Sequence, residues 1–81
     1  MTVHVRMFAV LRDRAGVSEA KIEMAKGATV AQAVDAIKDA FPSLSDQLKQ
    51  IAVAVNREYV QLETLLHDND ELALIPPVSG G

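Results

Sequence analysis

The chain has 81 residues, 49% of them hydrophobic, and a net charge of −3. This length corresponds to one domain, and the absence of cysteine excludes disulfides, a thiolate nucleophile and cysteine metal sites. No apolar run approaches the roughly 18 residues of a membrane span, and Met1 precedes no signal-peptide pattern, so we expect no membrane partner and a cytoplasmic location.

The first predicted element is a β-hairpin. Residues 3–11 alternate, which predicts a strand with five inward side chains, Val3, Val5, Met7, Ala9 and Leu11. Residues 13–17 have the composition of a turn, and residues 19–24 alternate again as the partner strand.

A helix is predicted next. Thr29 is a good N-cap, and Gln32 three residues later completes a capping-box pattern. Apolar residues then recur at helical spacing and form one stripe for a sheet: Val30, Val34, Ile37 and Phe41. Pro42 ends the helix near Phe41.

Three further strands are predicted in the second half of the chain, at residues 51–55, 58–62 and 71–75. Leu65 and Leu66 are expected to fill the core from a loop, and the composition of residues 67–70 predicts a turn. In the last strand Leu72 and Leu74 face inward, and the two prolines that follow it end the sheet.

One helix and one sheet bury their apolar faces against each other, which predicts an α+β fold. The first and last strands are the most apolar long strands, so we place them side by side at the centre. The result is a β-grasp, or ubiquitin-like roll, with a mixed sheet of about five strands packed on one main helix. Residues 1–75 form this domain, and residues 76–81 form an extended, flexible C-terminal tail.

The tail has residues suited to reaching into another protein. Pro76 and Pro77 direct the chain outward in an extended form, and Gly80 and Gly81 have no Cβ, so they can pass through a narrow channel. The terminal carboxylate is ionised at neutral pH and can attack the α-phosphate of ATP in a partner's site. From the residues alone, a frayed terminus is the alternative interpretation.

The sequence resembles the small subunit of molybdopterin synthase, the sulfur carrier of molybdenum-cofactor biosynthesis. The resemblance covers the whole chain, and its most particular motif is the ending Pro76-Pro77-Val78-Ser79-Gly80-Gly81. Three other stretches match this family: Val5 to Arg12, Ala54-Val55-Asn56, and Leu66 to Ala73. Asn69 departs from the family, in which a glycine commonly occupies this position, but asparagine tolerates the left-handed conformation.

The resemblance implies a sulfur-transfer cycle. A ubiquitin-activating-type adenylyltransferase uses ATP and magnesium to adenylate Gly81, and a sulfur relay converts the anhydride to a thiocarboxylate. The tail then enters the large synthase subunit, with which the chain forms a heterotetramer, and gives its sulfur to cyclic pyranopterin monophosphate. The chain is therefore expected to be a non-catalytic subunit of a sulfurtransferase, with no stably bound cofactor.

A partner surface is predicted from three outward residues. Phe8 and Ile75 lie on the face opposite the core, and Tyr59 can join them from the edge region. The resemblance points to the same three positions as contacts with the large subunit, whereas coverage by the chain's own loops is the alternative.

Other functions are weighed against this one. His4 and His67 are isolated in the sequence, so no metal site is predicted. Residues 41–81 carry two Lys or Arg against six Asp or Glu, which disfavours nucleic acid and suits a basic protein groove. Two alternatives share the tail chemistry: a sulfur carrier for thiamine or cysteine synthesis, and a ubiquitin-like protein modifier.

Overall fold

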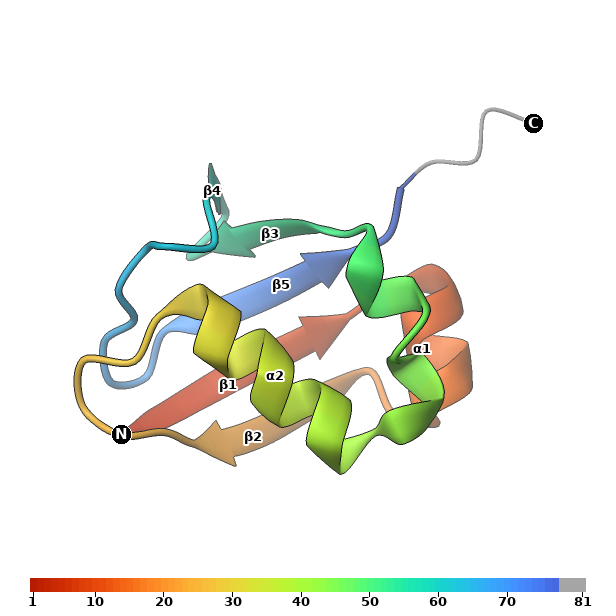
Figure 1. Cartoon of the computed structure of the whole chain (residues 1–81), viewed down its shortest axis with the longest axis horizontal. Coiled ribbons are helices and arrows are strands. Elements are labelled where there is room, and N and C mark those ends of the chain that lie inside the picture. The colour runs from red at the N-terminus through yellow and green to blue at the C-terminus, as the bar shows by residue number, and fades with distance from the viewer. Residues whose placement is uncertain (78–81) are drawn as a thin grey trace.

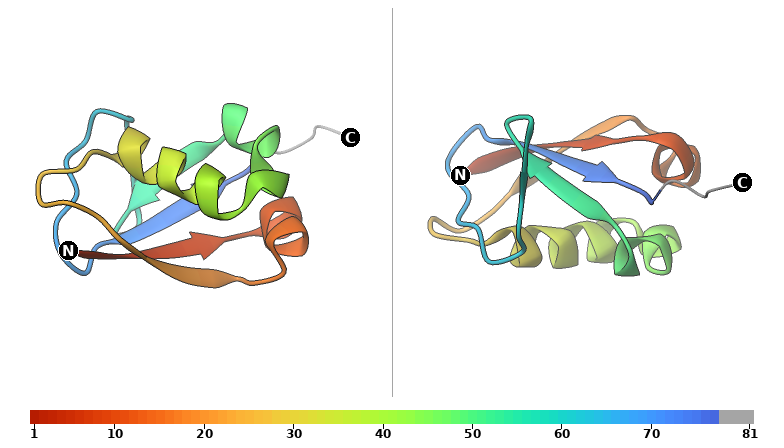
Figure 2. Two further views of the ribbon diagram at one scale, coloured as in Figure 1. Left: turned by 60° about the horizontal axis from the view of Figure 1, so that its bottom comes forward. Right: turned by 90° about the horizontal axis from the view of Figure 1, so that it is seen from above.

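Five strands form one mixed sheet, and a long helix covers one of its faces, in the computed structural model, which describes residues 1–77 (Figures 1 and 2). The strands are β1 (Thr2–Met7), β2 (Glu19–Glu23), β3 (Ala52–Val55), β4 (Glu58–Val60) and β5 (Glu71–Ile75). The helices are α1 (Ala9–Ala15) and α2 (Val30–Ala40), and two 3-10 turns follow α2, η1 (Pro42–Leu44) and η2 (Gln47–Lys49).

The strand order is β2-β1-β5-β3-β4, with β1 parallel to β5 and the other neighbours antiparallel. The first and last strands therefore lie side by side at the centre, as predicted. A mixed sheet with this order and one crossing helix is the ubiquitin-like β-grasp, which confirms the predicted fold.

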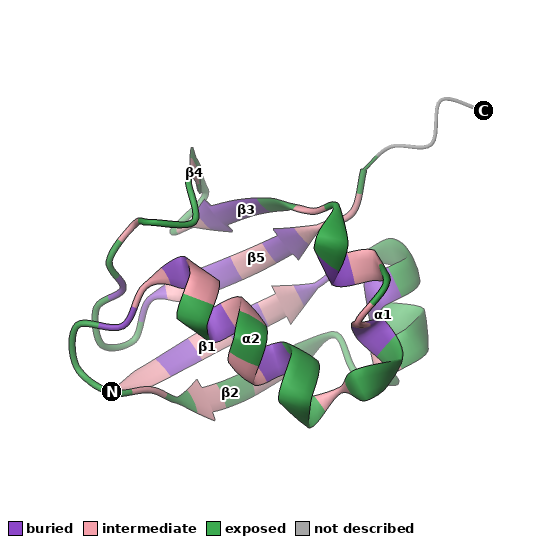
Figure 3. Ribbon diagram, viewed as in Figure 1, coloured by how far each residue is buried: buried purple, intermediate pink, exposed green. Residues whose placement is uncertain are grey.

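The core lies between the sheet and α2 (Figure 3). The inward side chains of β1 and β5 are almost completely buried: Val3, Val5, Met7, Leu72 and Leu74. From α2, Val30 and Ile37 are fully buried, whereas Val34 and Phe41 are half-buried and pack at the margin of the core. The predicted apolar stripe of the helix is thus confirmed, with Ala33 as a further buried member.

The start of α2 follows the predicted capping box. The Gln32 backbone N–H donates to the Thr29 hydroxyl at 3.3 Å, and the Thr29 N–H donates to the Gln32 side-chain oxygen at 2.9 Å. These two bonds satisfy backbone donors that have no partner within the helix. The helix ends at Ala40, and Pro42 begins η1.

The prediction of one strand over residues 3–11 is wrong in its second half. β1 ends at Met7, and Ala9 has a φ of 50°, which breaks the extended chain before α1. Leu11 is still buried, but as the inward residue of α1. Gly16 ends this helix with a φ of 79° and donates its N–H to the Arg12 carbonyl oxygen at 2.9 Å. The turn predicted over residues 13–17 is therefore wrong for residues 13–15, which are helical, and the chain turns only from Gly16.

Leu65 does not fill the core, contrary to prediction, because its side chain is 56% exposed while Leu66 is buried. Leu65 forms an isolated β-bridge with Thr29, so the backbone is extended at this point. Successive side chains on an extended backbone point in opposite directions, and only one of the pair can face inward.

Candidate functional site

The central strand β5 leads directly to the C-terminal tail (Figures 1 and 2). Leu72 and Leu74 anchor this strand in the core, and β1 and β3 pair with it on its two sides. Ile75 is its last residue, and Pro76 and Pro77 lie outside the sheet, beside α1 and η2. The tail therefore starts from a strand that is paired on both sides and buried on its inner face.

The predicted reactive group lies outside the described residues, as do all the tail positions after Pro77, namely Val78, Ser79, Gly80 and Gly81. The role of the Gly81 carboxylate thus stays a prediction. The division into a domain of residues 1–75 and a tail of residues 76–81 also stays a prediction.

The three residues predicted to contact a partner lie on the face of the sheet that α2 leaves uncovered. Tyr59 pairs with Ala54 and Ile75 with Ala52, and these registers place both side chains opposite the core. Phe8 follows β1 with an extended backbone, on the same side as Arg6. Tyr59 is 75% exposed, Phe8 is 39% exposed, and Ile75 is half-buried.

Small residues occupy the middle of this face, which we call the outer face. Ala73 of β5 pairs with both Arg6 and Ala54, so a row of short side chains separates the larger groups. Ala54 is buried in the isolated domain and Ala73 is half-buried, so Phe8 and Tyr59 are more exposed than the middle of this face. The alanines themselves give no signal of a site in the sequence; only their register in the sheet shows it.

Arg6 fixes the polar edge of the outer face. Its guanidinium lies 3.8 Å from a Glu19 carboxylate oxygen and 4.0 Å from one of Glu71, and 5.5 Å above the centre of the Phe8 ring. The ion pairs are exposed and therefore weak, and a cation-π contact at an exposed site contributes about 0.5–1 kcal/mol. Arg6 thus contacts the Phe8 ring on the outer face of the isolated domain.

A hydrogen-bonded group holds the turn before β5, and sequence reasoning missed it. The Asp70 carboxylate is buried and accepts from the Asn56 side-chain amide at 2.9 Å and from the His67 backbone N–H at 2.8 Å. Asn56 also accepts from the Glu71 N–H at 3.0 Å. Asn69 adopts a φ of 66°, so asparagine takes the left-handed conformation at this position, as predicted. These bonds connect the turn to the β3–β4 hairpin.

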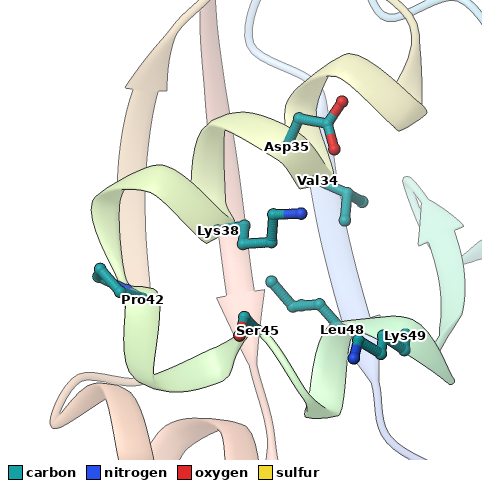
Figure 4. Close-up of a pocket in the computed structure, with 7 residues that line it drawn as sticks. All are labelled: Val34, Asp35, Lys38, Pro42, Ser45, Leu48 and Lys49. Carbon is teal, nitrogen blue, oxygen red and sulfur yellow. The ribbon is translucent and has the colours of Figure 1, made fainter.

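A groove of about 310 Å³ between α2 and the two 3-10 turns holds Asp35, Lys38, Ser45 and Lys49, but no histidine (Figure 4). Within residues 1–77, no group of three His, Cys, Asp or Glu side chains is placed to bind a metal ion. None of the helices in that range is both long enough and apolar enough to cross a membrane.

The fold and its tail define a class of protein: a ubiquitin-like β-grasp domain whose central strand continues into a Gly-Gly terminus. The chain belongs to the ThiS family, whose model matches residues 5–81. It is 41% identical to the molybdopterin synthase sulfur carrier subunit of Chlamydomonas reinhardtii, and the match covers 100% of both chains.

Solved structures agree with this assignment. The crystal structure of SAMP1 from Haloferax volcanii superposes with a TM-score of 0.93 at 34% identity and covers 100% of both chains. A chain in the complex of subunits 1 and 2 of the molybdopterin-converting factor from Helicobacter pylori superposes with a TM-score of 0.71 at 30% identity, again over 100% of both chains. Proteins similar to this chain thus include one solved together with a partner subunit.

Proposed function

We propose that this chain is the sulfur carrier of molybdenum-cofactor biosynthesis and that Gly81 carries the sulfur. The observation that supports it best is the end-to-end similarity to molybdopterin synthase sulfur carrier subunits, together with the ending Pro76-Pro77-Val78-Ser79-Gly80-Gly81. The central strand β5 gives that ending a rigid base, so the domain acts as a handle and the tail as the reacting part.

The proposed cycle has three steps. In the active site of a ubiquitin-activating-type adenylyltransferase, a carboxylate oxygen of Gly81 attacks the α-phosphate of ATP, with magnesium on the phosphates, and releases pyrophosphate. A persulfide on a donor protein then displaces AMP and forms an acyl disulfide with Gly81. A second thiol of the donor attacks the donor's own sulfur atom in that bond, so that the donor becomes a disulfide and the Gly81 thiocarboxylate is released. Finally, the thiocarboxylate sulfur is transferred to cyclic pyranopterin monophosphate, and water restores the Gly81 carboxylate.

The partner for the last step is the large subunit of molybdopterin synthase, which we propose binds the outer face through Phe8, Tyr59 and Ile75. The complex solved for the similar Helicobacter pylori protein supports a two-subunit arrangement. We propose a heterotetramer of two small and two large subunits, located in the cytoplasm. The side chains that catalyse each step belong to the partners.

A mass measurement tests the proposal. The chain is incubated with ATP, magnesium, the adenylyltransferase of its own organism and a sulfur donor, and its mass should rise by about 16 Da as sulfur replaces one oxygen. Omission of ATP is the control, and addition of the large subunit with cyclic pyranopterin monophosphate should return the mass to its starting value. An unchanged mass in the complete reaction contradicts the proposed function.

A second candidate function is supported by one observation. The structure is highly similar to that of SAMP1 from Haloferax volcanii, and a relative from that organism is named small archaeal modifier protein 1. This similarity favours a protein modifier. Both functions use the same adenylated tail and differ only in the nucleophile, which is a lysine amine for a modifier. Peptides carrying a Gly-Gly remnant of this chain on lysine, found in cells that express it, would favour the modifier.

A further inference from the structure

A small hollow lies at the base of the tail, outside the three-residue partner surface. Six residues line it: Val10 of α1, Asp46, Gln47 and Gln50 around η2, and the tail residues Pro76 and Pro77. Its volume is about 260 Å³, which is below the roughly 300–1,000 Å³ of small-molecule sites. The hollow therefore has room for one side chain of another protein rather than for a free ligand.

Gln47, one of the lining residues, has an unusual polar atom. The Gln47 side-chain oxygen is inaccessible to water, and it is the one buried side-chain polar atom of residues 1–77 without a hydrogen-bond partner. Leaving a buried acceptor unpaired costs free energy, so such a group needs an explanation. Because the terminal torsion of glutamine is broad, rotation of the amide would bring this oxygen to a donor bound in the hollow.

The other lining groups indicate what would bind. Asp46 contributes a carboxylate, and the amide oxygens of Gln47 and Gln50 are further acceptors. Val10 and the two prolines form apolar walls, and the prolines offer no N–H donor. A planar group with several donors and an apolar face satisfies both kinds of wall, and among side chains this is the guanidinium of arginine.

Asp46 is available for such a contact. Its partner among residues 1–77 is Lys49 at 3.6 Å, and both side chains are strongly exposed, so this ion pair is weak. The Asp46 side chain makes no capping hydrogen bond to η2. Among the residues that line the hollow, Asp46 is the one with a charge, and its carboxylate favours a cationic side chain.

We propose that this hollow, the tail-root socket, receives an arginine side chain of the enzyme that takes up the tail, and that the large subunit supplies it. The inference rests on the proposed function. From Pro77, the four residues to Gly81 can span at most about 14 Å. An arginine held against Asp46 and Gln47 would fix the start of that span, so the reacting terminus would reach a constant depth in the partner.

The test compares two socket variants with a matched control, by titration against the large subunit of the same organism. Asp46→Asn should weaken binding at least fivefold and reduce its salt dependence, because it removes the charge that faces the arginine. Gln47→Leu should weaken binding about threefold while the melting temperature stays equal or rises, since the unpaired buried oxygen is lost. Asp35→Asn removes the same charge from the α2 groove and should bind within twofold of wild type.

Alanine substitution of each arginine of the large subunit then identifies the partner. For one of them, Asp46→Asn should cause no further loss of affinity, because the interaction is already absent. If wild type binds and both socket variants bind equally well, the socket proposal is overturned but the proposed function is not. Additive effects for every arginine would have the same consequence. Wild type that forms no complex with the large subunit would contradict the proposed function, and the socket with it.

Discussion

The outer face gives the sharpest prediction, through Tyr59→Ala. Tyr59 is 75% exposed, so about a quarter of its surface is covered in the isolated domain. A fully buried tyrosine removes about 150–250 Å² from water, so the covered part corresponds to about 40–60 Å² and about 1 kcal/mol of stability. A partner that covers the remaining three quarters gains more than the domain does. We therefore expect stability to fall by about 1 kcal/mol or less, and affinity for the large subunit to fall more than about fivefold.

Leu65→Ala is the matched control for this variant. Leu65 is also an exposed large apolar residue, at 56%, but it lies on the loop between β4 and β5, away from the outer face. Urea unfolding measures stability, and calorimetric titration with the large subunit measures affinity. The reasoning is refuted if Tyr59→Ala binds within twofold of wild type, or if Leu65→Ala weakens binding by the same factor.

Three further predictions concern the stability of the β-grasp domain and are measured by urea or thermal unfolding. Ile37→Ala should destabilise the domain by about 2–5 kcal/mol, because Ile37 is fully buried between α2 and the sheet; a loss below about 1 kcal/mol would contradict this packing. Gly16→Ala should cost about 1–2 kcal/mol of stability. The cost comes from backbone conformation alone, because φ is 79° and a Cβ would meet nothing within 4 Å. Ala36→Gly in α2 is the comparison variant, because it tests ordinary helix propensity. Asp70→Ala should cost about 2–3 kcal/mol because two hydrogen bonds to a buried carboxylate disappear; an unchanged midpoint would show that the turn holds without them.

The parts of the fold that repeat a period were predictable from the sequence. The stripe of α2, the capping box at Thr29 and the alternation of Leu72 and Leu74 each follow a rule of local geometry, and each is confirmed. The end of β1 was not predictable in this way. Residues 7–11 are all apolar, so their pattern suits either a strand or a helix. Leu11 is inward in both. Only the left-handed backbone at Ala9 decides between them.

The candidate site also has a part that the sequence could predict and a part that it could not. The outer face follows from alternation, so Tyr59 and Ile75 could be placed before the structure was known, and Phe8 lies on that face although its strand ends one residue earlier. The tail-root socket could not be predicted, because it joins α1, η2 and the tail, which are far apart in the sequence and follow no common period. Gln47 and Asp46 have the composition of an ordinary surface turn, and only burial and position distinguish them.

The reacting end is tested by the length of the tail. Deletion of Gly81 leaves a carboxylate on Gly80, about 3.5 Å short of its position in the full chain. An in-line attack needs the reacting atoms about 3–3.5 Å apart and aligned, so a shift of this size removes the reaction while the β-grasp domain stays folded. The variant should unfold at the wild-type urea concentration, bind the large subunit through the outer face with unchanged affinity, and form no thiocarboxylate. Addition of one residue after Gly81 should have the same effect, because the terminus then overshoots. Molybdopterin formed at the wild-type rate by either variant would show that the Gly81 carboxylate does not carry the sulfur.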